Sequence, residues 1–301
     1  MMDYKKDISL VVSSCDKYSD AWYPYFELLK KYWPDHPQDI YLITENKEYS
    51  HAGLNISVCK HGEDCTWSDR LYRTLEQVKS KYIIFSLEDY FLLGYVKQDM
   101  IEKCISWMEE DPLIVECRLH GSERECLVES EKYAPFRYAE DNTPYRFDTQ
   151  VAIWNREALM HFIDRTEDPW QFEEKGTKRI IGTDKKFLWL YNSEPEDVSN
   201  DVFPYKMYAW FGYGIAWGYW LWNNKKWFRQ NGIKNVRYYK LGSLSETAAN
   251  RRMKYLYAKN PGFFTKLIKP IWRSYVRYKK IKTNILVFGI KKGLKESWKN
   301  K

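Results

Sequence analysis

The sequence holds little cysteine, no apolar leader and no internal repeat. Its six cysteines form no Cys-X-X-Cys pair and have no histidine at zinc-finger spacing, which favours reduced, mostly buried thiols over a metal site. A charged fraction of 30% and a mean hydropathy of −0.65 exclude a polytopic membrane protein, and 44% hydrophobic residues exclude a mostly disordered chain. No apolar segment with a cleavage site follows the polar first residues, so we expect no signal peptide.

Aromatic residues, in contrast, make up 18% of the 301 residues, and the net charge of +7 is unevenly distributed. Residues 251–301 hold 16 Lys and Arg against one acidic residue, a net charge of +15, which leaves −8 for residues 1–250. Apolar and aromatic pairs recur about every four residues in this tail between Phe263 and Val276. An aromatic stripe with a basic opposite face suits a helix lying on an anionic membrane. Docking on the acidic body or on another subunit is the alternative, and we expect no nucleic-acid partner.

Strand-like and helix-like segments alternate along the first ninety residues. We expect strands at 8–13, 39–44 and 82–86, separated by helices, which predicts an α/β fold with a mostly parallel central sheet flanked by helices. Ligands of such sheets bind beyond the carboxyl ends of the strands, which places Asp16 and the Glu88–Asp89 pair on one edge. We divide the chain into a domain at 1–250, with halves at 1–92 and 93–250, and a basic helical tail at 251–301.

Residues 93–250 have weaker secondary-structure signals than the first ninety residues. Strands are expected at 113–119 and 149–154, with helices starting after Asn155 and Asp168, and the polar stretch 121–148 is expected to be largely irregular. Residues 207–224 carry no charge, but their aromatics and glycines favour a buried or cleft-lining strand pair over a membrane span.

An acidic turn after a central strand suits a divalent cation bound to phosphate, because Mg²⁺ and Mn²⁺ prefer carboxylate oxygens and keep phosphate ligands. Glu88 and Asp89 have this position. A solvated acidic turn is the alternative.

The order of strand, Ser-Cys-Asp loop, helix, strand, capped helix with Arg70, strand and acidic turn resembles that of GT-A fold glycosyltransferases. The most similar part is residues 67–92, which resemble bacterial glycosyltransferases of capsule and lipopolysaccharide biosynthesis. The resemblance as a whole covers roughly residues 8–230. It implies a nucleotide-diphosphate sugar donor, first of all a UDP-sugar, and Mg²⁺ or Mn²⁺ held by Asp89 with Glu88 beside it. The family's Asp-X-Asp motif is incomplete here, because no second Asp follows and Tyr90 supplies no carboxylate, so metal dependence stays open.

The same resemblance implies roles for residues elsewhere. Ser14 and Asp16 contact the base and ribose, and Arg70 faces the donor diphosphate. Glu173, near the start of an acceptor-side helix, is the general base, with Glu174 as the alternative. Gln150 is expected to contact the nucleotide sugar, and Trp154, Trp170 and Trp217 are expected to contact the acceptor. Residues 1–92 are then the nucleotide-binding half and residues 93–250 the acceptor-binding half of a catalytic domain. The alternatives are a surface role for Arg70, a helix-capping role for Glu173 and a core position for Trp154.

We therefore expect an inverting glycosyltransferase that transfers sugar to a glycan or lipid-linked acceptor in bacterial surface polysaccharide synthesis. It would work in the cytoplasm, peripherally at the inner face of the cytoplasmic membrane. One alternative is a nucleotidyltransferase on a similar sheet, which the lack of glycine in residues 13–17 disfavours. The other is a non-catalytic glycan-binding or membrane-associated protein with this fold.

Overall fold

The structure is a computed structural model, and it describes residues 7–124, 126–194, 197–205, 215–216, 219–220, 224–234 and 236. Trp217, the expected domain boundary after residue 250 and the basic tail at 251–301 lie outside these residues. In the described part of the chain, no helix has the length and apolar character needed to cross a membrane.

A nine-stranded sheet runs through the described part, in the order β3-β2-β1-β4-β8-β5-β9-β7-β6. Its strands are β1 (Ile8–Ser13), β2 (Asp39–Thr44), β3 (Ile56–Lys60), β4 (Tyr82–Leu87), β5 (Ile114–Ser122), β6 (Leu127–Val128), β7 (Phe136–Ala139), β8 (Ala152–Asn155) and β9 (Lys186–Tyr191). The four strands from β3 to β4 are parallel, whereas β8 runs antiparallel between β4 and β5. β5 and β9 are again parallel, and β7 and β6 close that side as antiparallel strands.

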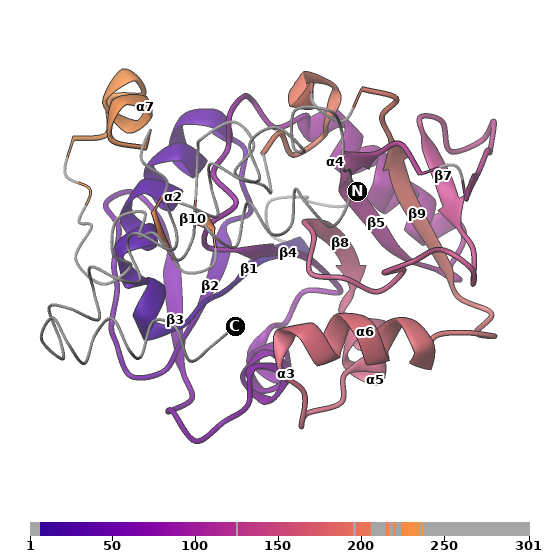
Figure 1. The fold of residues 1–301 in the computed structure, drawn as a ribbon, viewed down its shortest axis with the longest axis horizontal. Coiled ribbons are helices and arrows are strands. Elements are labelled where there is room, and N and C mark those ends of the chain that lie inside the picture. The colour runs from indigo at the N-terminus through magenta and orange to yellow at the C-terminus, as the bar shows by residue number, and fades with distance from the viewer. Residues whose placement is uncertain are drawn as a thin grey trace, which may run out of the picture. The chain divides into compact units, whose positions relative to one another are not determined.

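Helices cover both faces of this sheet (Figure 1). The described helices are α2 (Ser19–Tyr32), α3 (Trp67–Gln77), α4 (Gln98–Glu110), α5 (Arg156–Phe162), α6 (Pro169–Arg179) and α7 (Asn224–Gln230), with 3₁₀ turns η1 (Asp16–Tyr18) and η2 (Val198–Asn200). The apolar faces of α2 and α4 pack on one side of the sheet, and those of α3, α5 and α6 pack on the other. The predicted α/β fold with a central sheet flanked by helices is thus confirmed.

Burial on both faces explains why the central strands are such clear sequence signals. All six residues of β1 are buried, and β4 is buried except at its last residue, so both strands read as continuous apolar runs. Because β1, β2, β4, β5 and β9 all point the same way, they end at one edge of the sheet, which we call the carboxyl edge.

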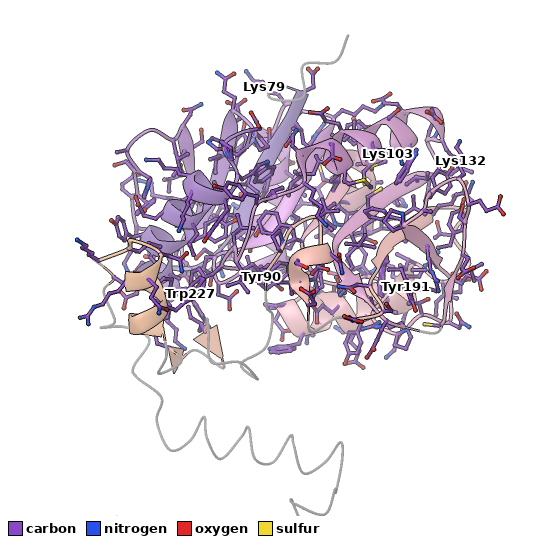
Figure 2. The ribbon with its side chains drawn as sticks, turned by 90° about the horizontal axis from the view of Figure 1, so that it is seen from above. Lys79, Tyr90, Lys103, Lys132, Tyr191 and Trp227 are labelled. Atoms are coloured by element: carbon purple, nitrogen blue, oxygen red, sulfur yellow. The ribbon has the colours of Figure 1, made fainter. Side chains whose placement is uncertain are left out.

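The second half is more regular than the sequence indicates. The stretch 121–148, expected to be largely irregular, contains β6 and β7, and β9 joins the sheet between β5 and β7. The expected strand pair in the uncharged stretch 207–224 is confirmed for its described residues, since β10 (Ile215–Ala216) and β11 (Tyr219–Trp220) pair antiparallel. Tyr90 follows the end of β4, and in the view from above it lies between Trp227 of α7 and Tyr191 of β9 (Figure 2).

Candidate functional site

Four loops leave the carboxyl edge in the first half of the chain, after β1, β2, β3 and β4. The carboxylate of Asp16, after β1, accepts the backbone N–H groups of Glu45, Asn46 and Lys47 at 3.2–3.3 Å. In return, the N–H of Asp16 donates to Glu45 Oε2 at 3.0 Å. Asp16 therefore ties the loop after β1 to the loop after β2, and its side chain shapes the edge on which we expected it to contact a nucleotide.

Arg70 joins this edge from α3. That helix begins after Thr66, whose hydroxyl accepts the N–H of Asp69 at 3.0 Å. The Arg70 guanidinium, on a residue only 8% exposed, donates from Nη1 to Glu45 Oε1 at 3.1 Å and to the Cys65 carbonyl at 3.3 Å. Arg70 is thus no solvated surface residue, and Glu45, which sequence reasoning missed, connects it to Asp16.

Glu88 and Asp89 leave β4 as a pair of carboxylates with little solvent. Burial, followed by the charge of Asp89, raises the pKa of the Glu88 carboxyl well above its usual range, and a hydrogen bond from Ser14 opposes the rise. Burial also raises the pKa of Asp89 to about 6. Among the described residues no Lys, Arg or His forms an ion pair with either carboxylate. Burial disfavours the ionised form of both carboxyl groups, and a bound divalent cation would neutralise their negative charge.

A divalent cation fits this pair in one specific sense. The described residues contain no group of three His, Cys, Asp or Glu side chains that could hold a metal ion. Mg²⁺ and Mn²⁺ are commonly held by one or two carboxylates, with phosphate oxygens and water completing the shell. The Glu88–Asp89 pair therefore suits a cation that arrives with a phosphate ligand, and does not suit a cation held by protein alone.

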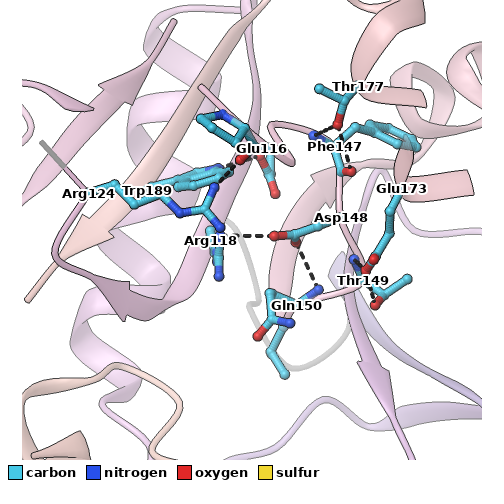
Figure 3. Close-up of polar contacts among 12 residues, drawn as sticks. Glu116, Arg118, Arg124, Phe147, Asp148, Thr149, Gln150, Glu173, Thr177 and Trp189 are labelled. Carbon is cyan, nitrogen blue, oxygen red and sulfur yellow. Dashed lines mark hydrogen bonds and ion pairs between the residues drawn. The ribbon is translucent and has the colours of Figure 1, made fainter. Parts of the chain in front are cut away.

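The loop before β8 brings the second half to the same place, through three consecutive residues, Asp148, Thr149 and Gln150 (Figure 3). Asp148 Oδ2 lies 2.9 Å from Nη1 of Arg118 on β5, and both side chains are 6% exposed. Glu173 of α6 accepts two hydrogen bonds at Oε1 from Thr149, from its N–H at 3.0 Å and from its hydroxyl at 2.6 Å. These contacts fix β5, β8 and α6 against one another.

Gln150 and Thr149 also connect this loop to the acidic end of β4. The Tyr90 hydroxyl donates to the Thr149 carbonyl at 3.3 Å, and the Tyr90 ring stacks on Tyr205 at 4.3 Å. The Tyr205 hydroxyl donates to Gln150 Oε1 at 2.6 Å. Thr149 is therefore bonded to Glu173 on one side and to the residue after Asp89 on the other.

Glu173 is a half-buried carboxylate on the second turn of α6. The helix begins with a capping box in which Asp168 accepts the N–H of Gln171 at 2.8 Å, so capping is done by Asp168 and not by Glu173. Burial first, and then the negative charge of Asp148, raises the pKa of Glu173. A carboxylate with a raised pKa is a suitable proton acceptor near neutral pH. Glu174 instead points to solvent, 71% exposed, and pairs with Lys178 at 3.1 Å.

Arg118 is held by an aromatic ring as well as by Asp148. Its guanidinium lies 4.2 Å from the ring centroid of Trp189 on β9, and that of Arg124 lies 5.0 Å from the same centroid. The indole N–H of Trp189 donates to Glu116 Oε2 at 3.2 Å. Burial, followed by the charge of Asp148, raises the pKa of Glu116 well above its usual range. The positive charge on this side of the site comes from Arg118 and Arg124.

The other residues predicted for the site lie in three different environments. Ser14 lies at the edge, where its hydroxyl accepts the indole N–H of Trp22 at 2.7 Å. Trp170, on the first turn of α6, is 75% exposed. Trp154 is 1% exposed and packs edge-on against Phe147 and Phe187, so the structure places it in the core, the alternative to a sugar contact.

Sequence reasoning missed Glu45 in the first half of the site and most of the residues in the second half: Glu116, Arg118, His120, Asp148, Asp201 and Tyr205. The one available signal was the alternation of three polar side chains, Glu116, Arg118 and His120, with the apolar residues of β5.

No protein-family model and no curated protein sequence matches this chain. Among solved structures, it aligns with a mannosyltransferase from Pyrobaculum calidifontis in complex with GDP-Man and Mn²⁺, at 12% identity and a TM-score of 0.45, covering 64% of this chain and 56% of that one. It aligns with S. aureus TarS, residues 1–349, at 10% identity and 0.40, covering 63% and 62%. A cytidylyltransferase from Leptospira borgpetersenii aligns at 9% identity and 0.41, covering 64% and 78%. The chain thus spans less than two thirds of the first two of these proteins.

Proposed function

We propose that this chain is a nucleotide-sugar-dependent glycosyltransferase. The observation that carries the proposal is the acidic turn at the carboxyl end of β4, where Glu88 is buried and Asp89 is half-buried and no described Lys, Arg or His pairs with either carboxylate. Two residues, Tyr90 next to Asp89 and Thr149, connect this turn to the half-buried carboxylate of Glu173. A donor diphosphate accompanied by Mg²⁺ or Mn²⁺ would supply the missing positive charge. When bound, such a cation stabilises the charge that develops on the leaving diphosphate.

The donor is bound by the first half of the chain in this proposal. Asp89, with Glu88 beside it, holds the cation, while Ser14 and the loop that Asp16 fixes contact the nucleoside, a uridine in the first instance. Arg70 faces the diphosphate from α3, with its Nε free of any described acceptor. Because Arg70 is already paired with Glu45, its contribution is to set the shape and the charge balance of the edge.

The acceptor is activated by Glu173. A sugar hydroxyl is a poor nucleophile at neutral pH, so a positioned base must take its proton as the oxygen attacks the anomeric carbon. Thr149 occupies Oε1, and no described residue hydrogen-bonds Oε2, which is the oxygen that receives the proton. The new bond between acceptor oxygen and anomeric carbon forms as the bond from that carbon to the phosphate oxygen breaks, with inversion. Trp170, exposed one turn before Glu173, offers a flat face for the acceptor sugar.

The test uses the purified full-length chain. Thermal-shift measurements with UDP-, GDP-, CMP- and dTDP-sugars, with and without Mn²⁺, should show stabilisation by one nucleotide class, and Asp89→Asn should abolish its Mn²⁺-dependent part. Asp99→Asn, which changes an exposed Asp on α4, is the matched control and should behave as wild type. Uniform absence of any shift would refute the proposal.

A transfer assay then separates binding from chemistry. Glu173→Gln should keep nucleotide-sugar binding and lower kcat by about 10²–10⁴-fold. Glu174→Gln, one residue away and in solvent, should retain the wild-type rate. Release of pyrophosphate from a nucleoside triphosphate, in place of sugar transfer, would instead indicate nucleotidyl transfer on the same edge.

We further propose that the acceptor is a lipid-linked bacterial surface glycan, and that residues 251–301 hold the enzyme peripherally at the inner face of the cytoplasmic membrane. The support is the net charge of +15 in this segment, together with its apolar and aromatic pairs. In flotation with anionic liposomes, the full chain should float and a chain ending at residue 250 should not. Equal flotation of the two would overturn this assignment.

A further inference from the structure

A histidine–aspartate pair lies at the carboxyl end of β5, two residues after Arg118. His120 Nδ1 is 2.7 Å from Oδ2 of Asp201, which is 1% exposed and follows η2. The other oxygen of Asp201 accepts the N–H of Gly121 at 3.1 Å and the side-chain amide of Asn192 at 3.2 Å. Both carboxylate oxygens are therefore engaged, and Asp201 is fixed in place.

The backbone is shaped around this pair. A Cβ on Gly121 would lie 2.4 Å from Cβ of Asn192 and 2.5 Å from Oδ1 of Asp201, so only glycine allows the carboxylate to approach the strand. The contact between Nδ1 and Oδ2 is an ion-pair contact outside hydrogen-bond geometry. An imidazole nitrogen approaches a carboxylate oxygen to 2.7 Å only when that nitrogen carries the hydrogen, which leaves a lone pair on Nε2. The arrangement thus presents one defined hydrogen-bond acceptor on the opposite side of the ring.

That acceptor has no partner among the described residues, although the His120 side chain is only 13% exposed. The imidazole packs against Tyr205, with ring centroids 4.6 Å apart, and Tyr205 stacks on Tyr90 next to Asp89. Nε2 is not among the buried polar atoms of the described residues, so this nitrogen, unlike Nδ1, stays open to a ligand.

We propose that Nε2 of His120 accepts a hydrogen bond from a sugar hydroxyl, with Asp201 as the positioning residue that fixes the imidazole. This rests on the proposed function, in which Glu173 remains the base. The ligand class is a neutral sugar, because hydroxyl groups are its hydrogen-bond donors and the ring of Tyr205 beside His120 supplies an apolar surface.

The first test is a variant pair. His120→Asn keeps an amide donor to Asp201 in place of Nδ1 but removes the acceptor at Nε2, whereas His120→Gln carries its amide out to the Nε2 position. We expect His120→Asn to raise the acceptor KM about 3- to 12-fold, as the loss of one hydrogen bond does, with nucleotide binding and thermal unfolding unchanged. His120→Gln should recover part of this loss, and His161→Asn, on the exposed side of α5, should have no effect.

The second test does not depend on catalysis. In the full-length chain labelled with ¹⁵N-histidine, the Nε2 resonance that disappears in His120→Asn should show an unprotonated nitrogen and should shift on titration with neutral methyl glycosides. An unchanged resonance with every glycoside, together with a wild-type acceptor KM in His120→Asn, would overturn the inference and leave the proposed function intact. A glycoside-dependent shift in a chain that transfers no sugar would support the contact and refute the transferase.

Discussion

The ion pair between Arg118 and Asp148 allows the most demanding prediction, because stability and chemistry both depend on it. The two charged groups lie 2.9 Å apart with 6% of each side chain exposed, and Arg118 is also stacked on Trp189. Removing one member of such a pair leaves the other charge buried without its partner, which costs about 3–5 kcal/mol. We therefore expect Arg118→Met and Asp148→Asn each to lower the free energy of unfolding by about that amount, and the double variant to lose less than the sum.

The same two substitutions should move the pKa of Glu173 in opposite directions. The negative charge of Asp148 raises this pKa and the positive charge of Arg118 lowers it. Asp148→Asn removes the first effect and leaves the guanidinium unopposed, so the acid limb of the pH–rate profile should move to lower pH. Arg118→Met removes the second effect and leaves Asp148 unopposed, so the acid limb should move to higher pH.

Urea unfolding and the pH dependence of kcat measure the two effects on the same purified variants. The exposed pair of Glu174 and Lys178 on α6 is the matched control, and Glu174→Gln or Lys178→Met should change the free energy of unfolding by no more than about 0.5 kcal/mol. Acid limbs that move in the same direction in both buried-pair variants would refute the electrostatic link to Glu173. Unfolding energies within 1 kcal/mol of wild type, on the order of a surface pair, would refute the burial argument.

Two further predictions concern groups that support this region. Gly176→Ala should lower the free energy of unfolding, measured in urea, by about 1–3 kcal/mol, because the new Cβ would lie 2.3 Å from the ring of Phe147. Lys175→Ala, on the exposed side of α6, is the control and should change this free energy little. Equal effects of the two substitutions would contradict the packing argument. Burial raises the pKa of Glu116 in the folded protein, so the folded state binds this proton more tightly than the unfolded state does. The free energy of unfolding therefore falls as the pH rises above the unfolded pKa of about 4.3, by at most about 1.4 kcal/mol per pH unit. Glu116→Gln should flatten that decline between pH 5 and 8, and a decline as steep as wild type would show that Glu116 is ionised in the fold.

The first half of the molecule could be predicted from sequence because its signals are local. β1 and β2 have the predicted bounds, and β4 extends the predicted strand by one residue, since strands buried on both faces are continuous apolar runs. The loops that follow such strands are then adjacent by topology alone, which brought Asp16 and Asp89 to one edge. What the pattern could not supply is the partner of each side chain, such as Glu45 between Asp16 and Arg70.

In the second half, β5, β8, α5 and α6 lie where strands and helices were predicted, but the contacts of the site could not be predicted because they join residues far apart in sequence. Arg118 meets Asp148 across thirty residues, and His120 meets Asp201 across eighty-one. Neither pair has a spacing that a helix or strand period would reveal, and β9 enters the sheet between strands that precede it in sequence. The helix that carries Glu173 could be predicted, because its start is a local signal, with Asp168 as N-cap and Pro at the first turn.

Tyr90 shows how tertiary contacts explain an incomplete motif. Its hydroxyl donates to the Thr149 carbonyl, and the charges of Asp89 and Asp148 both act on it. A carboxylate at position 90 would face a carbonyl oxygen and two negative charges, so this position requires a hydrogen-bond donor. The second carboxylate of the acidic turn therefore precedes Asp89 as Glu88, where Ser14 can donate to it. Under the proposed function, the Glu-Asp pair performs at the end of β4 what Asp-X-Asp performs elsewhere, and Tyr90 connects it to the loop that holds Glu173.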